Sequence, residues 1–200
     1  MQFNLKAVIV SAAILGAAAP SMAAVITFEG FDDSTVFTTK NFGAGVRLAG
    51  AQILSLGGSL NPNFPPHSGV NVIYNQSGAM TLDFSSEVDF FGGFFTYNQA
   101  LLIEAYDAAN TLIDSASGTC SANYIGSGCG APNEYLQVDA LGAIKRVVVS
   151  GGGGNNFTVD DVSFTGSRDP GVVPEPCSIA LVLAGLGAVA ATRRRRSAQS

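Results

Sequence analysis

Short apolar segments separated by turn residues run through most of this 200-residue chain. Several segments alternate apolar and polar positions, as in residues 81–84 (Thr-Leu-Asp-Phe), which is typical of a strand with one buried face. Turn clusters such as Gly57-Gly58 and residues 75–78 separate the segments at a spacing of about ten residues. The pattern predicts strands at residues 25–28, 46–48, 52–56, 70–74, 80–84, 88–97, 101–106, 112–115, 135–138, 144–150 and 157–164.

Between residues 24 and 166, no window of 11 or more residues shows a clear helical stripe, so we expect an all-β domain. A string of this many short strands buries its faces and closes its edges most readily as a two-sheet, jelly-roll-like sandwich. At about 140 residues, the domain is large enough to enclose a real core. Phenylalanines on both sides of Gly92-Gly93 predict a bulge or bend in a core strand there.

The first 23 residues have the three-part layout of a secretory signal peptide. Lys6 precedes an apolar run over residues 7–19, Pro20 breaks that run, and Ser21-Met22-Ala23 places small residues before a predicted cut. The run is shorter than the roughly 20 residues that a membrane span needs. We therefore predict export through the general secretion machinery and cleavage by signal peptidase, rather than a buried N-terminal helix.

The last 30 residues form a C-terminal segment with its own ordered layout. Pro174 and Pro176 keep the backbone extended and accessible, because each fixes φ and lacks an N–H. An uncharged apolar stretch over residues 179–191 follows, and four consecutive arginines close it. The stretch can hold the chain in a bilayer only marginally, and the arginines favour the cytoplasmic side. This order predicts transient anchoring in the inner membrane with the N-terminal part outside.

The three ordered parts of this tail resemble the PEP-CTERM sorting signal. The resemblance implies recognition by an exosortase, a membrane protease that removes the helix and the arginines. Cys177 follows the motif where a small residue such as Ser or Ala is more usual, which leaves lipidation open beside an incidental role. The residues that carry the motif are Val173, Pro174, Glu175, Pro176, Arg193, Arg194, Arg195 and Arg196.

These features divide the chain into five parts. The predicted organisation is a signal peptide over residues 1–23, an exported β-sandwich domain over 24–166, a linker with the V-P-E-P motif over 167–176, a transmembrane sorting helix over 177–192 and a basic cytoplasmic tail over 193–200.

The net charge of the exported region limits the classes of partner that the domain is expected to bind. Residues 24–169 hold 14 acidic and five basic residues, a net charge of −9 that the terminal arginines mask in the whole-chain value of −5. Nucleic-acid binding needs clustered Lys and Arg, so we expect no nucleic-acid partner. The chain has no Trp, and its five Tyr are the candidates for stacking on a sugar, unless they simply flank a sheet with the hydroxyl at the rim.

Two cysteines, Cys120 and Cys129, lie in a Gly/Ser/Asn-rich stretch of a chain expected outside the cytoplasm. That compartment permits disulfides, and a metal pair would need two further ligands nearby. We therefore predict a disulfide that closes a loop of about ten residues, worth roughly 2.5–3 kcal/mol on the chain-entropy model.

Acidic residues stand at both ends of the domain, in residues 26–33 and 157–164. Both ends resemble the first and last strands of carbohydrate-binding jelly rolls, where a structural Ca²⁺ lies between neighbouring strands. The resemblance implies Glu29 and either Asp160 or Asp161 as ligands, since an alternating strand presents only one of two consecutive side chains to a face. Solvated strand-end charges are the alternative.

The sequence singles out no catalytic residue. His67, the single histidine, lies in a Pro-rich loop and is expected to be solvated, and no G-x-S-x-G elbow accompanies it. We therefore expect a non-enzymatic surface or extracellular-matrix protein, processed by exosortase and associated with exopolysaccharide in a biofilm. The alternatives are a carbohydrate-binding module with a defined glycan and, third, a secreted hydrolase with a carboxylate pair.

Overall fold

The computed structural model describes residues 23–76, 78–151 and 156–165. Within these ranges the regular secondary structure is nearly all strand, and its one helical element is a single 3₁₀ turn, η1, at Gly43–Gly45. The prediction of an all-β domain is confirmed. The strands are β1 (Ala23–Ile26), β2 (Val36–Phe37), β3 (Lys40–Phe42), β4 (Val46–Ala49), β5 (Ala51–Ser55), β6 (Asn71–Asn75), β7 (Met80–Tyr97), β8 (Leu101–Tyr106), β9 (Leu112–Ser117), β10 (Glu134–Gly151) and β11 (Phe157–Thr165).

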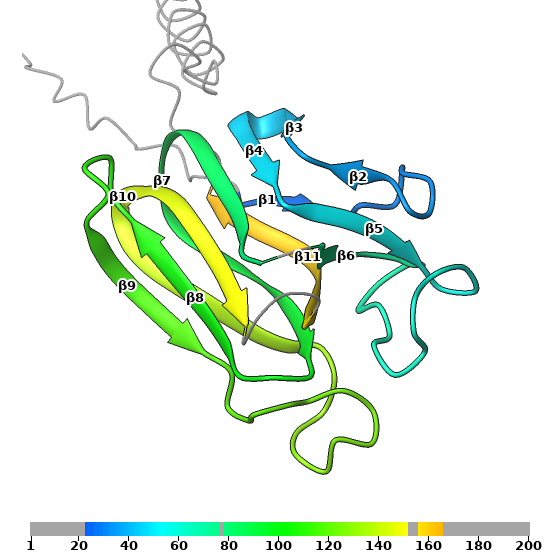
Figure 1. The fold of residues 1–200 in the computed structure, drawn as a ribbon. Helices are drawn as coiled ribbons and strands as arrows, with labels where there is room; N and C mark the ends of the chain where they lie inside the picture. Colours follow the sequence, from blue (N-terminus) through cyan, green and yellow to red (C-terminus); the bar gives the residue numbers. More distant parts are fainter. Residues whose placement is uncertain (1–22, 77, 152–155, 166–200) are drawn as a thin grey trace, which may run out of the picture. The chain divides into compact units, whose positions relative to one another are not determined.

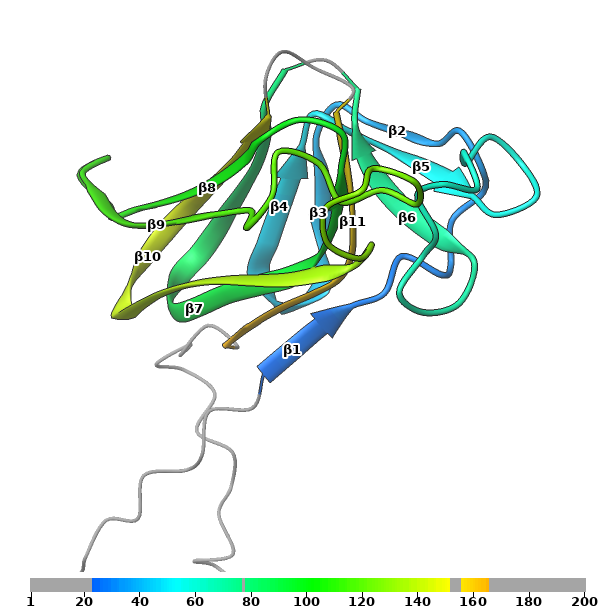
Figure 2. The ribbon, with the colours of Figure 1, turned by 90° about the horizontal axis from the view of Figure 1, so that it is seen from below.

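The strands form one continuous antiparallel sheet folded into two layers (Figures 1 and 2). In the first layer the order is β3, β4, the start of β7, the end of β10, β8 and β9. In the second layer, the end of β7 lies between the start of β10 and β11. The last part of β11 pairs with β1, whereas its first part pairs with β6, and β5 and β2 follow β6 in the sheet. This is the predicted jelly-roll-like sandwich.

Two strands of 18 residues each, β7 and β10, belong to both layers. The sequence pattern predicted two strands in place of each, because polar residues interrupt the apolar alternation near Ser85–Glu87 and again after Asp139. The structure instead bends each strand there, and the register between them shifts twice, after Asp139 and after Ile144. Bulges of this kind let one strand turn the corner between packed sheets.

The core lies between the layers and is built from alternate positions of the strands. In β8 the buried positions are Leu101, Ile103 and Ala105, with half-exposed residues between them. The ring of Phe84 in the first layer lies 5.2 Å from the ring of Phe164 in the second, which ties the layers directly. Burial of an aromatic side chain of this size stabilises the fold by about 1.5–3 kcal/mol.

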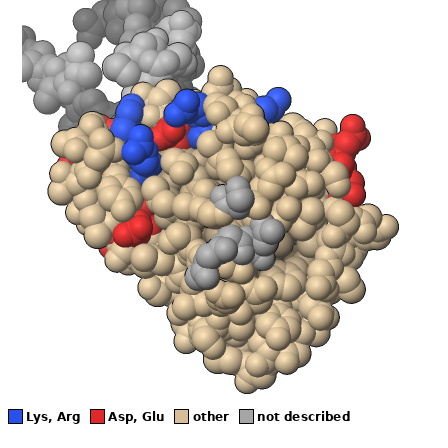
Figure 3. All heavy atoms as spheres, in the orientation of Figure 1, with Lys and Arg blue, Asp and Glu red and all other residues tan. Residues whose placement is uncertain are grey.

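Both ends of the described sandwich meet at one edge, because β1 pairs with the last part of β11 and Ala23 lies opposite Thr165. Basic side chains gather along one edge of the face shown in Figure 3. Two arginines, Arg47 and Arg146, bond the same carboxylate, Asp83, at 2.7 and 2.8 Å. These arginines are therefore paired with a carboxylate at the surface of the sandwich, and they hold the pKa of Asp83 below its usual value although burial opposes that shift.

Candidate functional site

The loop between β5 and β6, residues 56–70, lies over the outer face of the second layer. Val72 is only 1 % exposed although it points away from the core residue Ile73, which shows that this face is covered. The ring of His67 stacks on the ring of Phe94 of β7, with centroids 3.4 Å apart and planes 6° from parallel. The loop is therefore packed against the sheet, and its histidine is one of the residues that pack it.

Two consecutive carboxylates of β11 fasten the middle of the β5–β6 loop. Asp160 Oδ2 accepts the backbone N–H groups of His67 and Ser68, both at 2.9 Å. Asp161 Oδ2 lies 2.6 Å from His67 Nδ1, and its Oδ1 accepts the hydroxyl of Ser68 at 2.9 Å. Backbone and side chains of the same two loop residues are thus bonded to neighbouring acids.

A break in the alternation of β11 makes this pairing feasible. Asp161 has a φ of 47°, in the left-handed region, and the register with β7 shifts between Asp160 and Ser163. A regular strand would send consecutive side chains to opposite faces, so the prediction that only one of these two acids could face outward is wrong. The bulge brings both to the same loop.

Glu29 fastens the end of the same loop, from a different element. Its Oε1 accepts the backbone N–H groups of Val70 and Asn71, both at 3.0 Å. Asn71, 3 % exposed, returns two hydrogen bonds to the backbone oxygens of Phe28 and Phe31 at 3.0 Å. The segment after β1 and the start of β6 are thus held together by reciprocal bonds.

The environment of Asp160 disfavours its charged form. The residue is 1 % exposed, and this burial raises the pKa of the Asp160 carboxyl to about 6. The N–H donors of Ser68, Asp161 and His67 act in the opposite direction, and the nearby carboxylate of Asp161 adds to the rise. Burial outweighs the donors, so part of the population is protonated near pH 6.

The three acids named for calcium therefore all bond the loop that follows β5. Their oxygens accept N–H and O–H groups, whereas Ca²⁺ needs six to eight oxygens free to converge on one point. Among the described residues, no group of three or more His, Cys, Asp or Glu side chains could hold a metal ion. The calcium site stays a prediction, and an ion there would have to displace loop donors.

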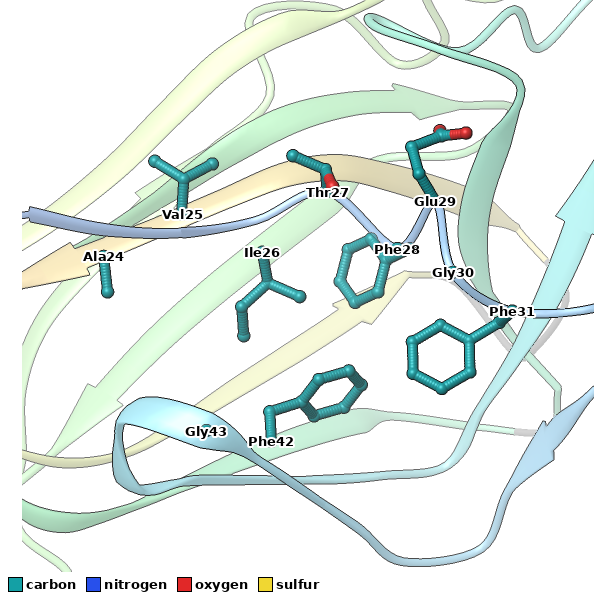
Figure 4. Close-up of a pocket in the computed structure, with 10 residues that line it drawn as sticks. All are labelled: Ala24, Val25, Ile26, Thr27, Phe28, Glu29, Gly30, Phe31, Phe42 and Gly43. Atoms are coloured by element: carbon teal, nitrogen blue, oxygen red, sulfur yellow. The ribbon is translucent and has the colours of Figure 1, made fainter.

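A cluster of phenylalanines lies beside Glu29 (Figure 4). The rings of Phe28, Phe31 and Phe42 surround a hollow of about 350 Å³ along β1, and the carboxylate of Glu29 points away from them. Phe28 and Phe42 meet edge to face with centroids 5.9 Å apart. This region is an extension of the core, and it positions the turn that carries Glu29.

A second loop, residues 118–133 between β9 and β10, lies beside the first. Cys120 and Cys129 form a disulfide there, with Cα atoms 6.0 Å apart. Asn123, 1 % exposed, donates to the oxygen of Phe95 and accepts the N–H of Tyr97, and so docks the loop on the end of β7. The disulfide closes the loop around this buried amide.

Tyr97 supports the same loop from below. Its side chain is fully buried, so it can neither stack on a sugar nor lie at the rim of the sheet, the two roles predicted for the tyrosines. Its hydroxyl bonds Glu134 Oε2 and accepts the N–H of Cys120 at 3.4 Å. Burial, reinforced by the bond to Glu134, raises the pKa of Tyr97 to about 12.

The two loops are joined to each other. The rings of Phe64 and Tyr124 stack with centroids 5.7 Å apart and planes 8° from parallel, and Ile125 donates its N–H to the oxygen of Asn63 at 2.9 Å. A pocket of about 240 Å³ opens between the β5–β6 loop and the strands beneath it. Its lining residues are Leu54, Ser59, Leu60, Asn61, Phe64, Tyr74, Asn98, Phe157 and Thr158.

Sequence reasoning did not identify this pocket or the role of His67. His67 lies 94 positions from Asp161, and only the bulge and the loop path bring them together. The Pro-rich composition of residues 65–67 was the one sequence signal for the packing of His67, because prolines indicate a rigid loop rather than a flexible one. Asn123 gave no signal, since an asparagine in a Gly/Ser-rich stretch is ordinarily a turn residue.

Several predicted features lie outside the described residues. They are residues 1–22 of the signal peptide, the linker over 167–176, Cys177, the sorting helix over 177–192, the tail over 193–200, and the motif residues from Val173 to Arg196. Within the described ranges, none of the structure is a helix long and apolar enough to span a bilayer.

Comparison with known families finds a match in the tail of this chain. Residues 172–196 match the PEP-CTERM protein-sorting motif. The chain is thus an exported protein, processed by exosortase and transiently anchored through its C-terminus. No curated protein is significantly similar to it in sequence.

Solved structures resemble the domain only distantly. A DUF4465 family protein from Bacteroides caccae is 12 % identical at a TM-score of 0.49, over 73 % of this chain and all of that one. TmCBM61 in complex with β-1,4-galactotriose is 11 % identical at 0.39, over 61 % and 88 % of the two chains. A variant of CBM29-2, a family 29 carbohydrate-binding module, is 16 % identical at 0.37, over 80 % and 96 %. The jelly-roll-like architecture is defined by this chain's own strand pairings.

Proposed function

We propose that this chain is a non-enzymatic protein of the cell surface or extracellular matrix, which associates with exopolysaccharide after exosortase has processed it. The observation that carries the proposal is the sorting motif at residues 172–196, which indicates export and processing by an exosortase. The sandwich that precedes it has paired strands and a hydrogen-bonded β5–β6 loop, which suits a structural or binding role outside the cell.

The engagement of His67 supports a role without catalysis. Its ring is stacked on Phe94 and its Nδ1 is bonded to Asp161, so the histidine helps to pack the β5–β6 loop. Asp160 and Glu29 hold the backbone of the same loop. The acidic side chains that were predicted as calcium ligands therefore hold a surface loop in place.

A carbohydrate-binding module with a defined glycan is the second candidate, favoured by one specific observation. The pocket beside Phe64 combines apolar side chains with amide and hydroxyl groups on a preformed surface. Such a combination is what sugars require, since they present apolar C–H faces and many hydroxyls. This candidate refines the first, because it names the contact through which the association would occur.

The proposal is tested by fractionation of an exopolysaccharide-producing bacterium that carries an exosortase. The processed chain should sediment with the polysaccharide matrix and be released when a glycosidase degrades that matrix. Glu175→Ala should leave the protein exported and unprocessed in the membrane fraction, whereas Glu87→Ala, an exposed charge on β7, should behave as the unmodified chain does. Processed protein that stays free in the medium, with no polysaccharide attached, would overturn the proposal.

A further inference from the structure

The pocket under the β5–β6 loop has the size and chemistry of a site for one small ligand. We propose that it binds a single neutral sugar unit of the polysaccharide, an inference that rests on the proposed function. Its volume of about 240 Å³ lies below the roughly 300–1,000 Å³ of pockets that enclose drug-sized ligands. One pyranose ring is a ligand of suitable size, and the remainder of a polymer would extend outside.

The lining provides both kinds of contact that a sugar needs. Apolar contact comes from the half-buried side chains of Leu54 and Phe64, which can cover the C–H face of a ring, while Leu60 and Phe157 are buried behind them. Polar contact comes from the exposed side chains of Ser59, Asn61 and Asn98 and from half-buried Tyr74. Thr158 is only 5 % exposed, and its hydroxyl donates to the oxygen of Thr96. The exposed side chain of Asn98 has no hydrogen-bond partner among the residues that the structure describes, so its amide can both donate to and accept from hydroxyls.

The electrostatics select neutral sugars over uronates. None of the lining residues is charged. A negative charge is bonded to the lining, because Asp33 accepts the hydroxyl of Ser59 at 2.6 Å and its N–H at 3.1 Å. These donors hold the pKa of Asp33 below its usual value, so it stays ionised at neutral pH and disfavours a second carboxylate nearby.

The wall of the pocket is fixed before any ligand arrives. Phe64 is stacked on Tyr124, and Tyr124 belongs to the β9–β10 loop that the Cys120–Cys129 disulfide closes. Asn123 anchors the same loop to β7. Because a preformed site avoids the cost of ordering its walls, the disulfide contributes to affinity without touching the ligand.

The pocket lies at the start of β11, where Phe157 and Thr158 contribute to it, whereas the chain continues toward the sorting tail from Thr165 at the end of that strand. A strand of nine residues separates the two points by roughly 25 Å. Attachment through the tail and ligand binding therefore use different ends of β11.

Binding measurements on the exported protein test this site. The probes are the purified exopolysaccharide of the producing strain, neutral hexose oligosaccharides and glucuronate oligosaccharides, each titrated by calorimetry. Phe64→Ala should weaken binding of the exopolysaccharide and of the best neutral oligosaccharide roughly tenfold, through loss of the stacking wall. Asn98→Ala should weaken it about three- to tenfold, the worth of one net hydrogen bond.

Two further variants separate the pocket from general destabilisation. Paired Cys120→Ser and Cys129→Ser changes should weaken binding at a temperature where thermal unfolding shows the domain still folded. Tyr106→Phe, on β8 of the other layer, should leave affinity unchanged. Asn98 is exposed, so its variant keeps the test decisive even if Phe64→Ala fails to fold.

The outcomes distinguish this site from the broader function. If the exopolysaccharide binds and the Phe64 and Asn98 variants bind equally well, the pocket assignment is overturned and the proposed function stands. Preference for glucuronate over neutral oligosaccharides would overturn the assignment of sugar class. If no polysaccharide binds the unmodified exported protein, both fail together.

Discussion

The stability of this domain should fall as the pH rises from 4 to 7.5, because of one buried carboxyl group, Asp160. Its pKa in the folded state is about 6, against a usual value of 3.8. The folded state therefore holds the proton more tightly than the unfolded state between these values. The stabilising contribution is complete below about pH 4 and is lost as pH rises through about 6.

The magnitude follows from the shift of roughly two pKa units. At about 1.4 kcal/mol per unit, ionisation of Asp160 should cost about 3 kcal/mol of the free energy of unfolding. In Asp160→Asn the titrating proton is absent. The new amide group would face the N–H of Asp161, which Asp160 Oδ1 accepts at 2.8 Å, so at pH 4 the variant should be about 1–3 kcal/mol less stable than the unmodified protein.

The assay is urea unfolding followed by far-ultraviolet circular dichroism, at pH 4 and at pH 7.5, on the unmodified protein and the variant. The stability advantage of the unmodified protein over Asp160→Asn should shrink by about 3 kcal/mol between the two pH values. Asp32→Asn, an exposed substitution with the same change in charge, serves as the matched control. An advantage that is equal at both pH values, or a carboxyl titration of Asp160 near pH 4 by NMR, would refute the reasoning.

Three further predictions concern the disulfide, the calcium ion and the tail. Changing both Cys120 and Cys129 to Ser should lower the free energy of unfolding by about 2.7 kcal/mol, the chain-entropy value for a loop of about ten residues, and an unchanged urea midpoint would contradict this. If Glu29 and one of Asp160 and Asp161 hold calcium, EDTA should lower the Tm measured by scanning calorimetry, since a ligand of the folded state alone stabilises it; a constant Tm would remove the ion. Deletion of residues 174–200 should leave the Tm nearly unchanged while membrane retention in fractionated cells is lost, whereas a truncated chain that does not fold would show that the tail is part of the domain.

The sequence alone determined the class of fold and the sorting of the chain. Alternation with period two depends only on local order along the chain, so it predicted the strands of β8 and β11 almost residue for residue. The tail is likewise read as a linear signal, because its prolines, apolar stretch and arginines act in order rather than through tertiary contacts. Neither inference required knowledge of which strands are neighbours.

The bending of β7 and β10 was decided by the tertiary structure. Residues near Ser85–Glu87 are polar because the strand crosses from one layer to the other there and leaves the core briefly. From the sequence, such a crossing cannot be distinguished from a turn, since both interrupt the apolar alternation. Strand pairing resolves the ambiguity, because β10 runs alongside β7 through both halves.

The roles of the acids were also decided by tertiary structure. A resemblance implied Glu29 and either Asp160 or Asp161 as calcium ligands, with solvated strand-end charges as the alternative, and the sequence contains no information on the path of the β5–β6 loop. That loop brings the N–H groups of His67 and Ser68 to Asp160, across more than 90 positions of the chain. A buried carboxylate needs hydrogen-bond partners, and their identity depends on which distant backbone reaches it in the folded state.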